Sequence, residues 1–154
     1  MATFTAPFNI AKGRAVEFVN RVKTGDPAAS RLYAIPLSTS VAQATAIDVD
    51  DFAALLTAGA VEQTAGGWSR ITLAAADITA LTPDDTNDRF DADFIDLVWA
   101  GPTTGNNIVS IVICYASVAT PTNAQLIPIS HHDFPITADG SQVTATVAVF
   151  YRAS

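Results

Sequence analysis

The sequence predicts a mainly β fold: an antiparallel β-sandwich or jelly-roll-like domain with an N-terminal helix and one further short helix. Short apolar segments recur along most of the chain, and Gly, Pro, Asn and Asp separate them, as in all-β domains. Apolar residues make up 49% of the chain and charged residues 15%, which excludes a disordered protein. The 154 residues suit a single domain, which we divide into an N-terminal helical arm, 1–30, and a sandwich body, 31–154.

Residues 8–23 are predicted to form the N-terminal helix. Apolar side chains recur in this stretch at steps of three and four residues, and the cations occupy the other faces. Gly25 is expected to cap the helix in a left-handed conformation, and Pro27 prevents the helix from continuing. Gly13 lies inside the stretch and lowers its helix propensity.

Residues 31–37 are predicted to form a strand in which Pro36 cannot donate a backbone hydrogen bond. We therefore expect this segment to be an edge strand or to end near the proline. Residues 48–56 are predicted to form the short helix, because aspartates crowd its first turn and Gly59 follows its end.

Beyond residue 60 the pattern is that of strands and turns. Turns are expected at 66–67, 83–88 and 101–107, and a hairpin turn at 139–141. Neither face of the last predicted strand is strongly polar, which predicts a central strand or one that another subunit covers. The strands predicted in this part of the chain are 68–73, 89–94, 95–99, 108–115, 126–130 and 143–151.

The charge of the chain restricts its partners. Eight Lys and Arg stand against fifteen Asp and Glu, for a formal net charge of −7. Because nucleic-acid affinity depends on cations that neutralise phosphates, we expect no direct binding to nucleic acid. Five of the eight cations lie in the first 31 residues, where they form a solvated helix face or meet an acidic neighbouring subunit: Lys12, Arg14, Arg21, Lys23 and Arg31.

The sequence also indicates where the protein is made. No apolar run approaches the roughly eighteen residues that a membrane-spanning helix needs, so we expect no membrane partner. The first residues lack the charged-then-apolar order of a signal peptide, which predicts synthesis in a host cytoplasm. Cys114 lies in an apolar run and is expected to be a small buried side chain, not a reactive thiol.

Six aspartates between residues 84 and 96 are the candidate metal ligands. Carboxylates suit Ca²⁺, but the spacing offers neither the glycine nor the closing glutamate of the helical calcium loop. Turn formation explains the first of these aspartates equally well, and an acidic contact between subunits, through Arg89 or a neighbour's arginine, is a further interpretation. We predict no metal site and no cofactor. The six are Asp84, Asp85, Asp88, Asp91, Asp93 and Asp96.

His131, His132 and Asp133 are the candidate catalytic residues. Adjacent residues of an extended segment point to opposite faces, so the two imidazoles are poorly placed to share a metal ion. The chain has no Gly-x-Ser-x-Gly motif to present a nucleophile, and the glycine pair at 66–67 lacks the lysine of a phosphate-binding loop. We therefore predict that the protein is not an enzyme.

Aromatic and arginine side chains are the candidate contact residues. Aromatic residues near strand ends serve more often as core or interface anchors than as the lining of a ligand groove. A carbohydrate-binding β-sandwich module is the alternative in which they line such a groove. The predicted interface residues, which the sequence does not separate from core residues, are Phe8, Phe18, Arg21, Trp68, Arg89, Trp99, Phe134, Phe150 and Tyr151.

Several segments of the chain resemble the motifs of one family, the small structural virion proteins of tailed bacteriophages. Residues 85–99, DTNDRFDADFIDLVW, resemble its hallmark, in which an Asp-x-Thr-Asn-Asp run leads through Phe-Asp-Ala-Asp to a tryptophan. Residues 64–73, TAGGWSRITL, resemble its T-x-G-G turn and strand. Three later segments are also similar to the family's strands and last hairpin: 108–115, 126–134 and 137–141.

This resemblance covers about residues 64–154 and carries an expectation of function. It implies a capsid decoration or cement protein on the capsid exterior, which binds between subunits of the major capsid protein and to copies of itself as a homotrimer. A tail or neck component, or the base of a receptor-binding fibre, is the alternative that the resemblance leaves open.

Overall fold

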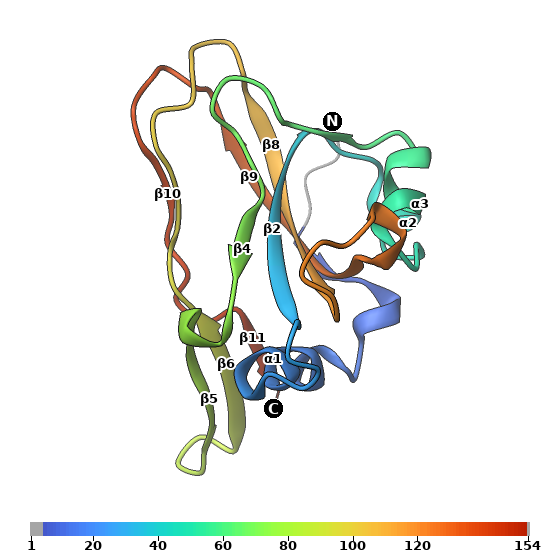
Figure 1. Cartoon of the computed structure of the whole chain (residues 1–154), viewed down its shortest axis with the longest axis vertical. Coiled ribbons are helices and arrows are strands. Elements are labelled where there is room, and N and C mark those ends of the chain that lie inside the picture. Colours follow the sequence, from blue (N-terminus) through green and yellow to red (C-terminus); the bar gives the residue numbers. More distant parts are fainter. Residues whose placement is uncertain (1–4, 154) are drawn as a thin grey trace.

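The computed structural model describes residues 5–153 and is mainly β, with antiparallel sheets and few helices, as the sequence predicts (Figure 1). The larger sheet has the strand order β1-β9-β8-β2-β3, and β4 also pairs with β2. Its strands are β1 (Ala6–Pro7), β2 (Arg31–Thr39), β3 (Val61–Glu62), β4 (Ile71–Leu73), β8 (Ile108–Ala116) and β9 (Ile127–Ile136).

Strands β2 and β8 form the centre of this sheet, so the predicted edge position of β2 is wrong. Pro36 lies between the part of β2 that pairs with β4 and the part that pairs with β3. Its carbonyl accepts a hydrogen bond from the backbone N–H of Gln63 at 2.9 Å. The N–H and C=O of a strand residue point to the same side of the strand. An N–H at Pro36 would therefore point into the gap between β4 and β3, so the sheet loses no hydrogen bond there.

The second layer faces one side of the larger sheet and consists of two small sheets, with the orders β11-β6-β5 and β10-β7. Residue 145 of β10 pairs with residue 97 of β7, and residue 151 of β11 pairs with residue 92 of β6. The segment from β10 to β11 therefore runs antiparallel to the segment from β6 to β7. Between these pairs, residues 146–150 lie opposite residues 93–96, so one side has an extra residue, as in a β-bulge. The strands are β5 (Ile78–Asp84), β6 (Arg89–Phe94), β7 (Leu97–Trp99), β10 (Val143–Ala145) and β11 (Tyr151–Ala153).

This bulge corrects the single strand predicted for 143–151. The backbone N–H of Val147 donates to the Asp96 carboxylate at 2.8 Å instead of to a strand carbonyl, and this interrupts the ladder. The predicted strand 95–99 begins only at Leu97 for the same reason. The turn at 139–141 is no hairpin between neighbours, because β9 pairs with β8 and β10 pairs with β7.

Three further strand boundaries differ from the prediction. Residues 68–70 precede β4, which is limited to 71–73. Residues 83 and 84, predicted as loop, belong to β5, where they pair with the start of β6. Strand β9 continues six residues past the predicted end at 130, to Ile136, because its pairing with β8 extends along the whole of β8.

The N-terminal helix is shorter than predicted. A 3-10 turn, η1 (Asn9–Ala11), precedes helix α1 (Ala15–Thr24), and Gly13 separates the two with φ +79°. Only glycine adopts this left-handed backbone at little cost, so the residue interrupts the predicted continuous helix. Gly25 ends α1 with φ +66°, as predicted.

The helix predicted over 48–56 overlaps one helix of the structure, α3 (Phe52–Thr57), and a separate short helix, α2 (Gln43–Ala46), precedes the predicted region. Helix α3 begins late because the Asp51 carboxylate accepts a hydrogen bond from the N–H of Ala54 at 2.8 Å and caps the helix there. Gly59 follows its end with φ +111°, as expected. None of the helices in residues 5–153 is long and apolar enough to cross a bilayer.

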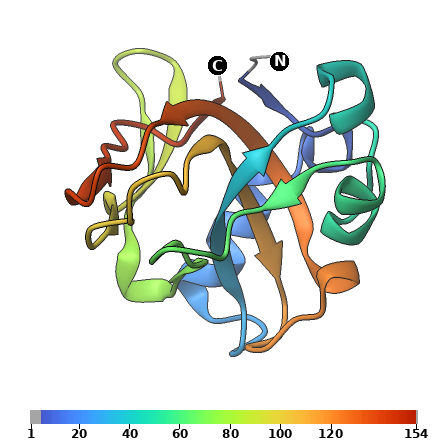
Figure 2. The same ribbon diagram turned by 90° about the horizontal axis from the view of Figure 1, so that it is seen from above.

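Side chains on the two faces of β8 belong to two separate cores. Ile111 and Ile113 face α1 and the second layer, whereas Val112 and Cys114 face α2 and α3. Figure 2 shows α2 and α3 on one side of the larger sheet and the second layer on the other. Eight of the nine residues of β8 are buried, which explains its nearly continuous apolar sequence. Cys114 is fully buried, as predicted, and burial raises the pKa of its thiol.

Helix α1 is a part of the first of these cores. Phe18, Val19 and Val22 are at most 1% exposed, and the Phe18 ring stacks on Tyr115 of β8 with the ring centroids 4.7 Å apart. Helix α1 therefore covers part of the central sheet.

Candidate functional site

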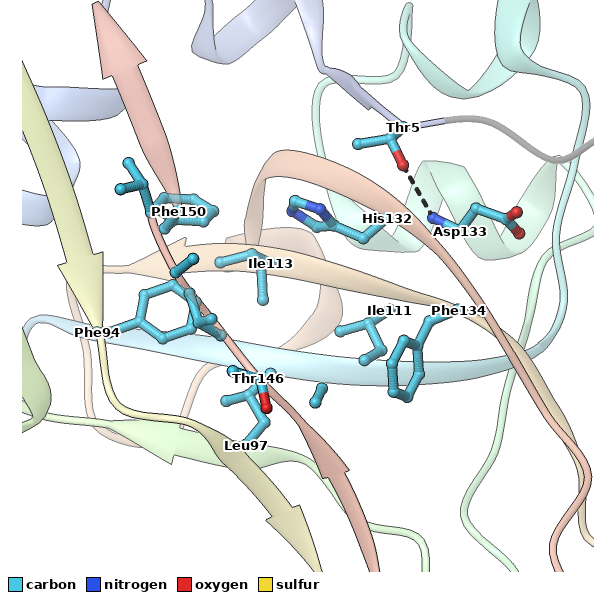
Figure 3. Close-up of a pocket in the computed structure, with 14 residues that line it drawn as sticks. Thr5, Phe94, Leu97, Ile111, Ile113, His132, Asp133, Phe134, Thr146 and Phe150 are labelled. Carbon is cyan, nitrogen blue, oxygen red and sulfur yellow. Dashed lines mark hydrogen bonds between the residues drawn. The ribbon is translucent and has the colours of Figure 1, made fainter.

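A cavity of about 250 Å³ lies between the two layers, beneath the bulge at 146–150 (Figure 3). Ile111 and Ile113 of β8 face it from the central sheet, and Phe94 and Leu97 face it from the second layer. An adjoining cavity of about 360 Å³ is lined by β1, the start of β11 and part of β9. The side chains that line both cavities are Thr5, His132 and Phe150.

His132 is the titratable group at the boundary between the cavities. Its Nε2 lies 2.8 Å from the hydroxyl of Ser130, and its ring centroid lies 6.2 Å from that of Phe150. Burial lowers the pKa of His132 to about 4, and the neighbouring His131 contributes in the same direction. The imidazole is therefore neutral near pH 7.

The two histidines point to opposite faces of β9, as the sequence predicts. His131 is 1% exposed, and its Nε2 lies 2.8 Å from the Ser40 hydroxyl on the side of the second core. Asp133 is exposed, and its backbone N–H donates to the hydroxyl of Thr5 at 3.3 Å. The two rings therefore do not meet at one point where they could share an ion.

The pair of Ser130 and His132 offers limited chemistry. A serine nucleophile needs a base that a third group orients, usually a carboxylate. Within residues 5–153 no hydrogen bond or ion pair joins His132 to a carboxylate, and a pKa near 4 makes the imidazole a weak base. The largely apolar cavities suit small apolar groups better than proton transfer.

The aspartates of residues 84–96 form ion pairs and backbone hydrogen bonds. Arg89 lies 2.9 Å from Asp84 and 3.2 Å from Asp91, and Arg152 binds Asp91 through two nitrogens at 2.7 and 3.2 Å. The hydrogen bond from Arg152 is the main cause of a lowered pKa at Asp91. In the described residues no three acidic, histidine or cysteine side chains gather in a group that could hold a metal ion.

Three other aspartates of this segment, Asp88, Asp93 and Asp96, also have local roles. Asp93 accepts a hydrogen bond from the backbone N–H of Phe94, and Asp96 accepts the one from Val147. Asp88 occupies the turn between β5 and β6 with φ +49°, a conformation that Asp tolerates better than most residues. Arg89, predicted as a contact to a neighbour, binds aspartates of its own hairpin.

The predicted interface residues fall into two sets. Phe8, Phe18, Trp68 and Trp99 are at most 2% exposed and belong to the cores. The two tryptophan rings lie 5.2 Å apart, and each indole N–H donates to a backbone carbonyl. The residues that keep a partly exposed side chain are Arg21, Arg89, Phe134, Phe150 and Tyr151.

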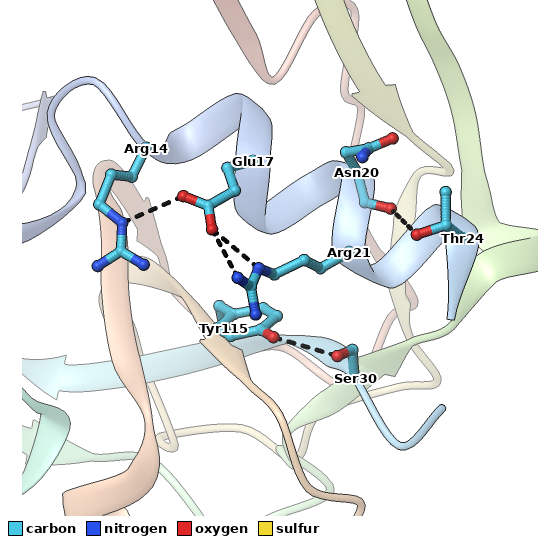
Figure 4. Close-up of polar contacts among 7 residues, drawn as sticks. All are labelled: Arg14, Glu17, Asn20, Arg21, Thr24, Ser30 and Tyr115. Atoms are coloured by element: carbon cyan, nitrogen blue, oxygen red, sulfur yellow. Dashed lines mark hydrogen bonds and ion pairs between the residues drawn. The ribbon is translucent and has the colours of Figure 1, made fainter. Parts of the chain in front are cut away.

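Arg21 extends from α1 toward Tyr115 and belongs to a small ionic group (Figure 4). Its guanidinium lies 2.8 Å from Glu17, which also pairs with Arg14 at 3.2 Å. Beneath this group the hydroxyls of Tyr115 and Ser30 are 3.1 Å apart and buried. Glu17 therefore partly neutralises Arg14 and Arg21 within the chain.

Sequence reasoning missed the exposed apolar residues of the second layer. Ile95, Val98 and Val149 are 42%, 47% and 37% exposed. The alternation of Leu97, Val98 and Trp99 is the signal that could have identified Val98, because its neighbours point into the core and it points away. The cavity beneath the bulge has no comparable sequence signal, since it depends on how distant strands pair.

Comparison of the chain with protein-family models, with curated proteins and with solved structures found no match. The motifs and the geometry described above are therefore the basis for assigning a function.

Proposed function

We propose that the protein is a structural virion protein of a tailed phage, a capsid decoration or cement protein that binds between subunits of the major capsid protein. The sequence resemblance over residues 85–99 is the origin of this proposal. This motif forms the turn after β5, all of β6 and all of β7. It thus supplies two of the five strands of the second layer.

The observation that carries the proposal is that the polar residues of the motif make ion pairs, backbone hydrogen bonds and a turn within the chain. Asp91 pairs with Arg89 and Arg152, Asp93 and Asp96 accept backbone hydrogen bonds, and Asp88 forms the turn. These contacts stabilise the conformation of the segment. They favour a role in which the surface of the domain binds other proteins over one in which a cluster of side chains acts on a substrate.

The low charge of the chain supports the same role. Only 15% of the residues are charged, and cement proteins bury flat, weakly charged surfaces against shell subunits. Many identical contacts on a symmetric shell compensate for the weakness of each single contact.

The test is the number and place of copies in particles of the phage that encodes this chain. Quantitative mass spectrometry of purified virions should give on the order of hundreds of copies per particle, because the protein would bind at every equivalent position of a symmetric shell. Gold-labelled antibody should mark the head. Particles stripped of the protein should lose infectivity at a lower temperature and recover when purified protein is added back.

Each other outcome has a definite meaning. Labelling of the tail or neck, with a dozen or fewer copies, would contradict the capsid assignment and favour a tail, neck or fibre-base component. Absence of the protein from purified particles would refute a virion role altogether.

A further inference from the structure

The cavity beneath the bulge is walled by apolar side chains from both layers. Ile111 and Ile113 line it from β8, and Leu97 and Phe94 line it from β7 and β6. The Phe94 ring lies beside that of Phe150, with the centroids 4.9 Å apart. A space of about 250 Å³ among such side chains is unusual, because protein interiors are packed as closely as organic crystals.

The bulge keeps this space accessible. The backbone N–H of Val147 donates to the Asp96 carboxylate at 2.8 Å, and that of Phe150 donates to a carbonyl of β6 at 3.1 Å. These two bonds attach the bulge to the second layer. Thr146 and Ala148 line the cavity and are also exposed to solvent, so a small molecule would enter between the strands at the bulge.

A pair of polar side chains lies where this cavity adjoins the second one. Ser130 is 9% exposed, and its hydroxyl lies 2.8 Å from Nε2 of His132. This is the one hydrogen bond that the His132 ring makes within residues 5–153, so its Nδ1 has no partner there. A neutral imidazole has one donor and one acceptor nitrogen. The ring can therefore exchange one further hydrogen bond with a bound molecule.

The cavity offers no charged group to a ligand. The Asp133 carboxylate points away from the apolar side chains (Figure 3). Arg152 borders the second cavity, but its guanidinium binds Asp91. Burial lowers the pKa of His132 to about 4, so the imidazole is uncharged near pH 7. An ionic ligand would lose its hydration here without gaining an opposite charge.

We infer that the cavity beneath the bulge binds a small, neutral, largely apolar molecule whose single polar group forms a hydrogen bond with the pair of Ser130 and His132. Ligand sites have this composition, with apolar walls and few placed polar groups. Since an apolar cavity of about 150 Å³ holds benzene, the present one suits about ten non-hydrogen atoms, as in an alkyl-substituted phenol. The inference goes beyond the proposed function because it requires no virion, so each of the two can fail while the other holds.

The test titrates the purified protein at pH 7 with para-propylphenol, which has the expected size, and measures affinity by isothermal titration calorimetry. Saturable binding is expected, with a dissociation constant below about 1 mM. Propylbenzene lacks the hydroxyl and should bind about threefold to tenfold more weakly, which corresponds to one hydrogen bond. The charged para-propylbenzoate should bind more weakly than the phenol by about tenfold or more.

Two further measurements locate the bound molecule. In the unaltered protein, the NMR methyl signals of Ile111 and Ile113 should shift during the titration, while those of Val112, which faces the other core, should not. Ala145→Phe places a ring in the cavity from β10 and should lower the affinity by about tenfold or more. Ala58→Phe is the matched control at the exposed end of α3 and should leave the affinity unchanged.

His132→Leu tests the hydrogen bond separately from the apolar contacts. The preference for the phenol over propylbenzene should fall to about onefold, and this ratio compares two ligands in one protein. The inference is overturned if the unaltered protein binds neither compound, if propylbenzene and the benzoate bind as tightly as the phenol, or if Val112 shifts in place of the isoleucines. It is also overturned if folded Ala145→Phe binds the phenol as tightly as Ala58→Phe does. Should Ala145→Phe not fold, the methyl shifts of the unaltered protein decide the location.

Discussion

At the scale of single residues, His132 makes the stability of the protein depend on pH. Its pKa is lowered from 6.5 to about 4 by burial, so the unfolded chain takes up a proton at a pH where the folded protein does not. Stability is therefore fully present above pH 6.5 and falls as the pH drops from 6.5 to 4. Linkage at 1.36 kcal/mol per pKa unit gives a loss of roughly 3 kcal/mol, to be measured by urea unfolding across this range.

The control for this prediction is His132→Gln. Glutamine retains a polar group that can contact the Ser130 hydroxyl, but it does not titrate. The variant should show a flatter pH profile between 6.5 and 4, while the carboxylates that titrate at lower pH affect both proteins equally. Identical slopes in the two proteins would show that His132 is not the group responsible.

The same residue shows what local sequence does and does not determine. Its orientation opposite to His131 follows from the alternation of a strand and was predicted correctly. Its environment was not predictable, because the Phe150 ring, whose centroid lies 6.2 Å from that of His132, comes from a segment outside β9. Single-residue chemistry here depends on contacts that only the folded chain creates.

At the scale of elements, the turns at one end of the sandwich depend on a close approach of two glycines. Gly101 has φ +64°, and a Cβ atom added there would lie 2.8 Å from the carbonyl oxygen of Gly140. The N–H of Gly140 donates to Pro102 at 3.0 Å and keeps the two loops together. We expect Gly101→Ala to lower the free energy of unfolding by about 2 kcal/mol or more, from the strained φ and the clash together.

Gly105→Ala is the matched control for this substitution. Gly105 also has a left-handed φ, +87°, but an added Cβ atom would meet nothing within 4 Å. This variant should lose only the conformational part, about 1 kcal/mol. Equal losses in chemical denaturation would contradict the proposed clash between the loops at 101 and 140.

Elements were predicted well where their signals are local. Strand β6 has the predicted bounds, 89–94, because a polar turn precedes it and a regular alternation runs through it. The end of α1 was also predicted, since Gly25 is a strong local signal. The strand predicted for 143–151 was wrong because its interruption arises from pairing with a partner that has one residue fewer. Pairing over such distances has no signature in the segment itself.

At the scale of the whole molecule, the arrangement of the layers depends on the central strands, because each face of these strands belongs to a different core. The nearly unbroken apolar sequence of β8 indicated a buried strand, and the structure uses it to separate two cores. Sequence reasoning predicted a sandwich body, 31–154, and an N-terminal helical arm, 1–30, within one domain. It could not predict that α1 and the second layer would cover the same face, because that depends on the order of strands in the sheet.

The participation of α1 in the core leads to a prediction about cooperativity. Phe18 is 1% exposed and stacks on Tyr115 at the centre of the larger sheet, in the same core as Trp68 and Trp99. Phe18→Ala should therefore lower the free energy of unfolding of the whole domain by about 3–5 kcal/mol. Far-UV circular dichroism and tryptophan fluorescence should shift together to a lower denaturant concentration, since the domain unfolds as one unit.

Asn20→Ala is the control on the same helix, because Asn20 is exposed and its substitution should change stability by no more than about 0.5 kcal/mol. A helical arm separate from the body would behave differently from the core element described above. In that case Phe18→Ala would remove helical signal while the tryptophans, which lie outside residues 1–30, kept their original transition. Because Phe18 and the two tryptophans share one core, the two transitions should stay coincident in both variants, and only the midpoint of Phe18→Ala should move.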